Sequence, residues 1–160
     1  MKFSTQEEYG LRCLLQIARL GPEGSLSISE IAKVEGLTSP HVAKLMSVLR
    51  KGGFVVSARG HVGGYSLAEP KLDILVKDVL ECLGGRLYDA EFCDRHSGAL
   101  EICTHAVDCS VRSLWQVLQS SIDRALEGMR LSDMLDQGKS NVTFFGETLP
   151  RATIGTADRT

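Results

Sequence analysis

Residues 26–70 read LSISEIAKVEGLTSPHVAKLMSVLRKGGFVVSARGHVGGYSLAEP and contain the signals for two short helices and a hairpin in succession. Ser27 and Glu30 have the spacing of a capping box, in which each side chain satisfies a free backbone N–H at the start of a helix. The pattern predicts a short helix over residues 31–35. Gly36 should end it, because glycine adopts the left-handed backbone that closes many helices.

A second helix should follow after a tight turn. Ser39 is the expected N-cap and Pro40 the first helical residue, since proline suits a position whose N–H needs no partner. Apolar residues then recur at helical spacing until Gly52 and Gly53, at positions Val42, Leu45, Met46 and Leu49. Two short helices joined in this way are typical of a helix-turn-helix. His41 and Lys44 lie off the apolar stripe and are expected to face a DNA groove.

The end of the stretch predicts a β-hairpin. Residues 54–58 and 65–67 favour strands, and Arg59 to Gly64 join them through a glycine-rich tip. Glycines let the backbone approach another surface, and Arg59 at the base of the hairpin is placed to enter a narrow minor groove. Directly after a helix-turn-helix, this hairpin indicates the wing of a winged helix. An ordinary surface hairpin is the alternative.

The charge distribution singles out the same region. The net charge is −2, but residues 1–71 carry nine Lys/Arg against six Asp/Glu, and residues 72–160 carry nine against fourteen. No acidic residue occurs between Glu35 and Glu69. Such a face favours an anionic partner, and double-stranded DNA is the partner we expect, although a chance asymmetry of a solvated surface is the alternative. The candidate contacts are Ser39, Pro40, His41, Lys44, Arg50, Lys51, Arg59, His61, Gly63 and Gly64.

The flanking sequence predicts a mainly α-helical protein with a small β wing. Helices are expected over residues 4–20, 72–83 and 109–129, with a last helical turn at 131–135. The helix from 109 carries a long apolar stripe, which favours a partner helix and hence a homodimer. We therefore divide the chain into a winged helix-turn-helix domain (1–83), a cysteine-bearing loop without regular structure (84–108), a dimerisation helix region (109–136) and a flexible tail (137–160) with local strand pairing at 141–145.

Three of the five cysteines, Cys93, Cys103 and Cys109, occur in or directly after this loop. Cys109 stands at the start of the long helix, where the partial positive charge and free N–H groups stabilise anionic sulfur. The spacing alone leaves inert buried thiols, a zinc site, an iron–sulfur cluster and a redox switch open. Cys13 and Cys82 lie in apolar helical segments and are expected to pack in the core.

The chain resembles the Rrf-type family of regulators, which includes IscR, NsrR and RirA. The resemblance rests on FSTQEEYGLRCLLQIA (3–18), on residues 26–70 with their RGHVGGY motif, and on the cysteine loop before a long helix. It covers roughly residues 1–135. It implies a homodimeric winged-helix transcription regulator, and its cysteine-bearing branch implies an iron–sulfur cluster, two-iron or four-iron, with Cys93, Cys103 and Cys109 as ligands.

A cluster held by three cysteines needs a fourth ligand, and here the chain departs from part of the family. Where one branch has a histidine three residues after the last cysteine, this chain has Arg112. Another branch uses an acidic residue near the N-terminus of the other subunit, and Glu8 stands at the matching position. The resemblance thus implies Glu8 as a metal ligand, with Glu7, His96 and His105 as competitors and a solvated carboxylate as the alternative for Glu8.

Several classes of protein are not expected. The chain has no common nucleophile, phosphate-binding or metalloprotease motif, so it is not predicted to be an enzyme. It shows no membrane-spanning segment or secretion signal, so we expect a cytoplasmic protein without a membrane partner. The function expected is transcription regulation through a sensor of iron, iron–sulfur status or nitric oxide. A cluster-free thiol–disulfide switch and a zinc-stabilised interaction module are the alternatives.

Overall fold

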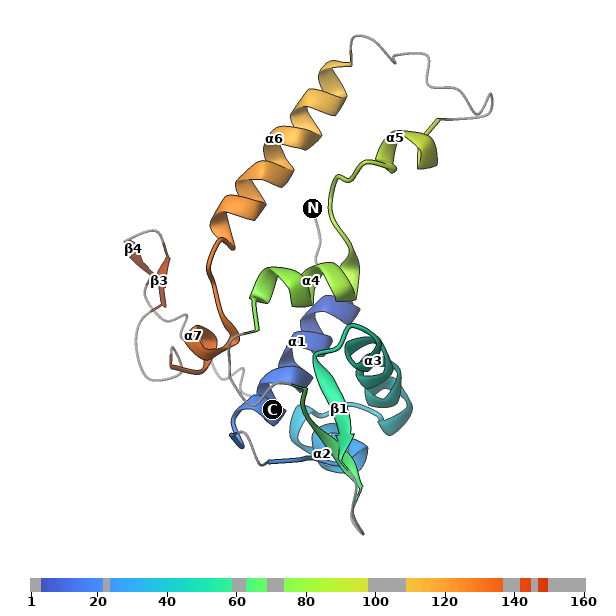
Figure 1. The fold of residues 1–160 in the computed structure, drawn as a ribbon, viewed down its shortest axis with the longest axis vertical. Coiled ribbons are helices and arrows are strands. Elements are labelled where there is room, and N and C mark those ends of the chain that lie inside the picture. Colours follow the sequence, from blue (N-terminus) through green and yellow to red (C-terminus); the bar gives the residue numbers. More distant parts are fainter. Residues whose placement is uncertain are drawn as a thin grey trace, which may run out of the picture.

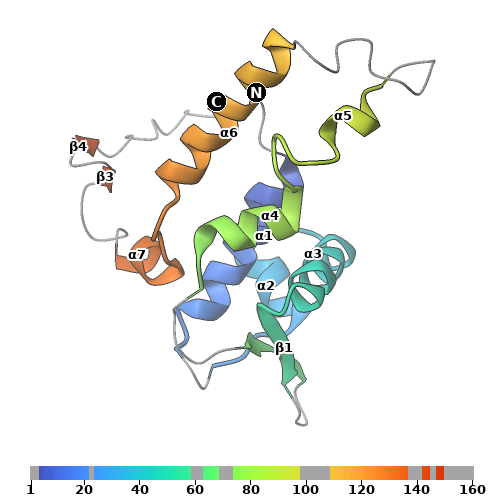
Figure 2. The ribbon, with the colours of Figure 1, turned by 45° about the horizontal axis from the view of Figure 1, so that its top comes forward.

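The computed structural model describes residues 4–21, 24–58, 63–68, 74–97, 109–136, 142–144 and 147–149. Its architecture is mainly helical, with two small antiparallel sheets, β1–β2 and β3–β4 (Figures 1 and 2). The elements in chain order are α1 (Thr5–Ala18), α2 (Ile28–Glu35), α3 (Ser39–Lys51), β1 (Val55–Ala58), β2 (Gly64–Leu67), α4 (Val76–Gly84), α5 (Phe92–Arg95), α6 (Ser110–Ala125), α7 (Leu131–Asp136), β3 (Val142–Phe144) and β4 (Glu147–Leu149).

The first two helices begin at capping boxes. Ser4 caps α1 together with Glu7, and Ser27 caps α2 together with Glu30, so the box predicted at Ser27 is confirmed. The predicted start of α2 at residue 31 was wrong, because residues 28–30 of a capping box already lie in the first helical turn. Gly36 ends α2 in the left-handed conformation, as predicted, with φ of 66°.

Helix α3 starts one residue earlier than predicted. Thr38, and not Ser39, is its N-cap, with extended backbone angles (φ −80°, ψ 144°) and no hydrogen bond from its side chain. Ser39 is the first helical residue and Pro40 the second. Both Thr38 and Ser39 are residue types that cap helices, so the backbone conformation decided which of them did so.

The predicted wing is present. Strands β1 and β2 pair in antiparallel register, with Val55 opposite Leu67 and Ala58 opposite Gly64. Leu26, just before α2, adds a third backbone segment, because its N–H donates to the carbonyl of Tyr65 (3.0 Å) and its carbonyl accepts from the N–H of Tyr65 (2.8 Å). The wing is therefore attached to the entrance of the helix-turn-helix.

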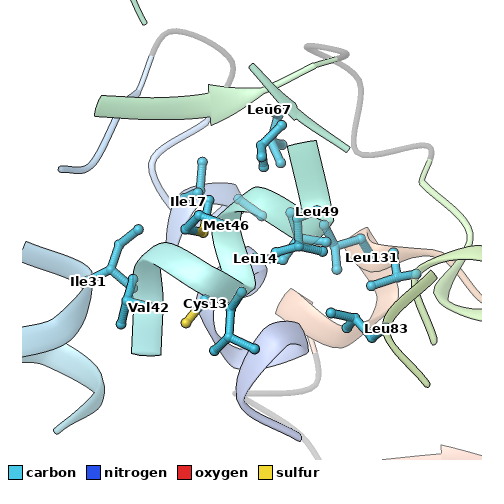
Figure 3. Close-up of a cluster of buried hydrophobic side chains, with 14 of the residues drawn as sticks. Cys13, Leu14, Ile17, Ile31, Val42, Met46, Leu49, Leu67, Leu83 and Leu131 are labelled. Atoms are coloured by element: carbon cyan, nitrogen blue, oxygen red, sulfur yellow. The ribbon is translucent and has the colours of Figure 1, made fainter. Parts of the chain in front are cut away.

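The hydrophobic core lies between the first three helices, the wing and α4 (Figure 3). Helix α1 runs through its centre, and α3 lays its predicted apolar stripe against it. The buried side chains include Cys13, Leu14, Ile17, Ile31, Val42, Leu45, Met46, Leu49, Val55, Leu67, Val79, Leu83 and Leu131. Among the described residues, α6 contributes none of the core side chains.

The last part of the chain returns to the core at Leu131. Leu75 and Arg130 form an isolated antiparallel bridge, in which Leu131 donates to the carbonyl of Ile74 (2.8 Å) and Val76 donates to that of Met129 (3.0 Å). This pairing keeps residue 75 extended, so α4 begins at Val76 and the predicted start at residue 72 was wrong.

Helix α6 is shorter than its apolar pattern suggested. It ends at Ala125, whereas the pattern predicted helix as far as residue 129. Gly128 has φ of 72°, a left-handed turn that redirects the chain toward the bridge with α4. The helix projects away from the body formed by α1, α2, α3 and the wing (Figures 1 and 2).

Two regions expected to lack regular structure contain short elements. Helix α5 forms a single turn, Phe92–Arg95, inside the cysteine-bearing loop. Strands β3 and β4 pair within the predicted tail, with Val142 opposite Leu149, so the expected local pairing is present. Cys103 and His105, like the rest of 98–108, lie outside the described residues.

Candidate DNA-binding face and cysteine site

Helix α3 presents a basic outer face opposite its core stripe. Ser39, Pro40, Lys44, Arg50 and Lys51 are all exposed on it. Two of the three basic residues stand in the last helical turn, so they also offset the negative end of the helix dipole. This face agrees with the sequence prediction of where cations gather.

The starts of α2 and α3 meet the wing at a shallow depression. Ser27, Ile28 and Ser29 line it from α2, Ser39 from α3, and Gly63 to Tyr65 from the wing. Helix N-termini direct free N–H groups and partial positive charge outward, which suits a phosphate group. The depression thus lies where the starts of two helices and the wing meet, next to the exposed start of α3.

The two described glycines of the wing differ in role. A Cβ at Gly64 would lie 2.9 Å from the carbonyl oxygen of Leu26, so glycine is needed there for the wing to reach Leu26. Gly63 is exposed and has φ of 51°, with open space around a Cβ position. Of the two, Gly63 is the one whose backbone is available to a ligand. Arg59 and His61 lie outside the described residues.

The His41 side chain makes a contact within the fold. Its ring meets that of Tyr9 edge to face, with 5.7 Å between the centroids, and Arg12 lies 5.5 Å from the centroid of the same tyrosine. The imidazole therefore joins α3 to α1. This packing competes with the predicted contact of His41 to a DNA groove.

Glu35, the last acidic residue before the acid-free segment, points inward. Its side chain is only 4% exposed, and its carboxylate accepts from Arg12 at 2.6 Å and from Gln16 at 2.5 Å. These contacts join α2 to α1 and pair the Glu35 carboxylate with a cation inside the fold. The carboxylate of Glu35 is therefore not exposed beside the basic face of α3.

Cys109 caps α6. Its sulfur accepts a hydrogen bond from the backbone N–H of Arg112 at 3.3 Å, so the predicted position of this thiol at a helix N-terminus is confirmed. Cys93 lies on α5, and its interaction with the Arg112 side chain is the main cause that raises the pKa of Arg112, with Cys109 as a smaller cause. Both cysteines are half-buried.

Aromatic contacts hold α5 against α6. The ring of Phe92 lies 5.2 Å from that of Tyr88, 6.4 Å from that of Trp115 and 4.2 Å from that of His96, between centroids. Desolvation, followed by the neighbouring Cys93, raises the pKa of Tyr88. Cys93 therefore lies in a partly apolar setting with one cation beside it.

The described candidates for a fourth ligand, Glu7, Glu8 and His96, have other partners. The Glu7 carboxylate accepts from the backbone N–H of Ser4 at 2.7 Å, and His96 Nδ1 lies 2.7 Å from the carbonyl oxygen of Phe92. Glu8 is 62% exposed and 3.9 Å from Arg12. Within the described ranges, no three His, Cys, Asp or Glu side chains converge as a metal site. One chain does not bring Glu8 to Cys93 and Cys109.

Cys13 packs in the core as predicted, whereas Cys82 is half-buried and lies outside the buried core cluster. Cys13 is fully buried, and burial, with Glu35 as the next cause, raises its pKa to about 11. The Cys82 sulfur lies 3.7 Å from the carbonyl oxygen of Val48, and burial raises its pKa. Both thiols contact the helices of the DNA-binding domain.

A polar network that the sequence did not reveal ties the cysteine segment to α4 and α6. Asp123 accepts from Arg86 (2.5 Å), Lys77 (3.2 Å) and Gln119 (3.1 Å). Gln119 is buried, and its side-chain oxygen also accepts from the backbone N–H of Tyr88 at 3.1 Å. Polar residues on an amphipathic helix ordinarily face solvent, so sequence alone could not distinguish Gln119 from its exposed neighbours.

The fold and the basic face define a winged helix-turn-helix DNA-binding protein. The chain belongs to the Rrf2 family, described as "Iron-dependent Transcriptional regulator", whose profile matches residues 3–137. It is accordingly a transcription regulator and not an enzyme, and the regulators of this family bind DNA. Among the described residues, no helix has the length and apolar character needed to cross a membrane.

Relatives with different names are similar to this chain in sequence and in fold. Protein rrf2 of Nitratidesulfovibrio vulgaris Hildenborough is 36% identical over 135 residues, which are 84% of this chain and 87% of that protein. The structure of T. potens IscR is 32% identical, with a TM-score of 0.66 over 87% of this chain and 89% of that one. CymR, described as the global cysteine regulator of B. subtilis, is 27% identical, with a TM-score of 0.66 over 85% and 97%. The relatives therefore establish the regulator class and leave the sensing chemistry to be argued from this chain.

Proposed function

We propose that this regulator senses iron, iron–sulfur status or nitric oxide through an iron–sulfur cluster, two-iron or four-iron, held by Cys93, Cys103 and Cys109. Glu8 of the other subunit is the proposed fourth ligand. The observation that carries the proposal is that Phe92, the neighbour of Cys93, packs against Trp115 of α6, the helix that Cys109 caps. Thiolates are soft ligands for iron, and a helix N-terminus with an adjacent guanidinium offsets their negative charge.

When bound, the cluster supplies a group whose charge and integrity change with iron supply, oxidants or nitric oxide. The chain's own residues hold it and transmit the change. Tyr88 and Phe92 place α5 beside α6, and Cys109 joins the segment to the first turn of that helix. Rearrangement of the cysteine segment therefore acts directly on the end of α6.

Helix α6 is also the proposed dimer contact. Val111, Leu114 and Val117 are 59%, 53% and 62% exposed, although all are large apolar residues on one side of the helix. A row of this kind is costly in water and is covered when two copies pair about a two-fold axis. In the proposed dimer, the second chain would supply Glu8 as the fourth ligand.

The route from the cysteines to the DNA runs along α6. With 16 residues, the helix is about 24 Å long at 1.5 Å per residue. After its far end, the chain is fixed to the DNA-binding domain by the Leu75–Arg130 bridge and by the buried Leu131. A displacement at Cys109 would thus change the orientation of the two DNA-binding domains of a dimer. The spacing of their α3 helices would change with it.

The proposed DNA contacts are those predicted from the sequence. Exposure on α3 supports Ser39, Pro40, Lys44, Arg50 and Lys51, and the depression at the wing supports Gly63. Gly64 contributes through the placement of the wing, and His41 through the start of α3. Arg59 and His61 complete the set on sequence grounds.

A thiol–disulfide switch is the second candidate. The segment of Cys93 packs against α6, the helix that Cys109 caps, and this placement also suits a disulfide, in whose formation two thiols lose two protons and two electrons to an oxidant. A related structure, Staphylococcus aureus CymR at 25% identity, is described as an oxidised form.

Anaerobic purification of the full chain distinguishes these candidates. We expect visible colour and comparable amounts of iron and acid-labile sulfide in the wild type and in the matched control Cys13→Ala. Cys103→Ala should lose most of both, because three thiolates hold the cluster as a set. A colourless wild type without iron and sulfide overturns the proposal. Retention of full iron and sulfide by Cys103→Ala overturns the ligand set.

A further inference from the structure

We infer that Asp123 is a positioning residue for DNA recognition: it fixes the angle between α6 and the DNA-binding domain, and so sets the half-site spacing that a dimer reads. The inference rests on the proposed dimer contact along α6 and does not depend on the sensing chemistry. The Asp123 carboxylate accepts from Arg86 at 2.5 Å and from Lys77 at 3.2 Å. Lys77 lies on α4 and Arg86 shortly after it, so two cations from the α4 side meet one carboxylate of α6.

The partners of Asp123 are themselves held in place. Arg86 also donates to the carboxylate of Glu81 on α4, and Lys77 lies 4.0 Å from that carboxylate. On α6, the buried Gln119 donates to Asp123 at 3.1 Å. Desolvation opposes the ionisation of Asp123, but the hydrogen bonds from its three donors outweigh it, so the pKa of this carboxyl lies below its usual value. Asp123 is therefore charged at neutral pH and has a defined position relative to α4.

Apolar packing between α4 and α6 is incomplete. A cavity of about 320 Å³ lies between the two helices, and Leu80 of α4 and Ile122 of α6 both line it. Among the residues that the structure describes, α6 adds no side chain to the hydrophobic core, and its buried residue is the polar Gln119. Interlocked apolar side chains resist rotation of a helix, whereas a helix beside a cavity has open space into which it can turn. The polar contacts of Asp123 therefore hold the angle of α6 at this point.

A small rotation of α6 is large on the scale of DNA. Over a helix of about 24 Å, a rotation of about 10° about the end near the Leu75–Arg130 bridge displaces the other end by about 4 Å. The rise of one base pair is about 3.4 Å. The exposed apolar row at Val111, Leu114 and Val117 lies in the half of α6 that moves. A changed angle would therefore shift the separation of the two DNA-binding domains by about one base-pair step.

The test compares Asp123→Asn and Arg86→Gln with the control Asp78→Asn, which makes the same charge change at an exposed position of α4. Each full-length protein is titrated with a two-half-site duplex that the wild type selects from a random-sequence pool, and with versions whose spacer is one or two base pairs longer or shorter. A duplex with one half-site is titrated as well.

We expect the wild type and Asp78→Asn to prefer one spacing by about tenfold, a usual strength of coupling between two sites. Asp123→Asn and Arg86→Gln should reduce this preference severalfold and leave the affinity for one half-site unchanged, because α3 and the wing are unaltered. The double variant should equal either single variant, since both changes break the same contact.

The outcomes separate this inference from the proposed function. A wild type that sediments as a monomer overturns both the proposed dimer contact and the inference. A dimeric wild type with no preferred spacing, or with a preference that Asp123→Asn retains in full, overturns the inference alone. Equal loss of affinity on every duplex indicates a structural defect and also overturns it. Thermal unfolding checks that each variant folds, and Arg86→Gln decides the outcome if Asp123→Asn does not fold.

Discussion

Single residues decide how the wing meets the helix-turn-helix and how α2 is held against α1. Gly64 is the clearest case, since the chain passes so close to Leu26 that only hydrogen fits in place of a side chain. Glu35 is another, because its buried carboxylate holds Arg12 and Gln16 of α1. Neither residue needs to touch DNA to matter for binding. Each fixes the position of residues that do.

Gly64→Ala should destabilise the protein by about 1–3 kcal/mol, because the added methyl group would meet backbone atoms of Leu26 that cannot move alone. Urea unfolding followed by circular dichroism measures the change in the free energy of unfolding. Ser57→Ala, an exposed position on the other strand of the wing, is the control and should stay within about 0.5 kcal/mol of the wild type. A wild-type value for Gly64→Ala would contradict the close approach.

Cys13 should make stability depend on alkaline pH. Burial raises its pKa from 9.0 to about 11, so the folded protein keeps the neutral thiol while the unfolded chain ionises it. The stabilisation is therefore complete below pH 9.0 and is lost as the pH rises toward 11. Relative to Cys13→Ala, the wild type should lose about 1–3 kcal/mol of unfolding free energy across this window. Parallel pH profiles of the two proteins would refute this role of burial.

At the level of secondary-structure elements, α6 differs from the other long helices. Helices α1 and α3 each bury several apolar residues, whereas the buried residue of α6 is the polar Gln119. Its attachments are the network around Asp123 and the bridge that follows it at Arg130. The apolar row of Val111, Leu114 and Val117 is left exposed by these attachments and is the proposed dimer contact.

Leu114→Glu should therefore convert a dimer into a monomer, since a carboxylate in the middle of the exposed apolar row cannot be buried without loss of hydration. Sedimentation velocity at micromolar concentration measures the change in mass. Ser120→Glu, a polar and exposed position on the same helix, is the control and should preserve the wild-type mass. If the wild type sediments as a monomer, or Leu114→Glu remains a dimer, α6 does not form the dimer contact.

At the scale of the whole molecule, the basic face of α3 and the candidate sensor cysteines lie in different parts of the structure. The basic face of α3 lies on the compact body, and Cys93 and Cys109 lie on the elements that project from it (Figure 1). Helix α6 connects the two ends, with the cysteines at one end and the bridge to α4 at the other. In the proposed dimer, this separation would let a change at the cysteines alter the orientation of the two DNA-binding domains without altering either domain.

The salt dependence of DNA binding tests the basic face. Each neutralised phosphate contributes a slope of about −0.9 to a plot of log K against log salt. Alanine at Lys44, Arg50 or Lys51 should flatten the plot by roughly one unit for each phosphate that is no longer neutralised. Titrations of an operator fragment at several salt concentrations measure it, with Arg124→Ala on α6 as the control. An unchanged slope in the triple variant, with the oligomeric state intact, would exclude this face.

The amino-acid sequence by itself determined the winged helix-turn-helix and the position of Cys109 at the start of a helix. Capping boxes, turn glycines and apolar periodicity act over a few residues, so they can be interpreted without knowing what lies across the fold. The same local character explains the errors at the start of α4 and the end of α6, where the bridge between Leu75 and Arg130 overrides the pattern.

Only the tertiary structure decided that Phe92, beside Cys93, packs against Trp115 of α6, that Gln119 is buried and that Glu35 faces inward. These contacts join residues far apart in the chain or choose one face of a helix over another. Such a choice depends on how whole helices pack, since a polar side chain is stable either in water or beside a buried partner. The sequence contains both possibilities, and packing selects one.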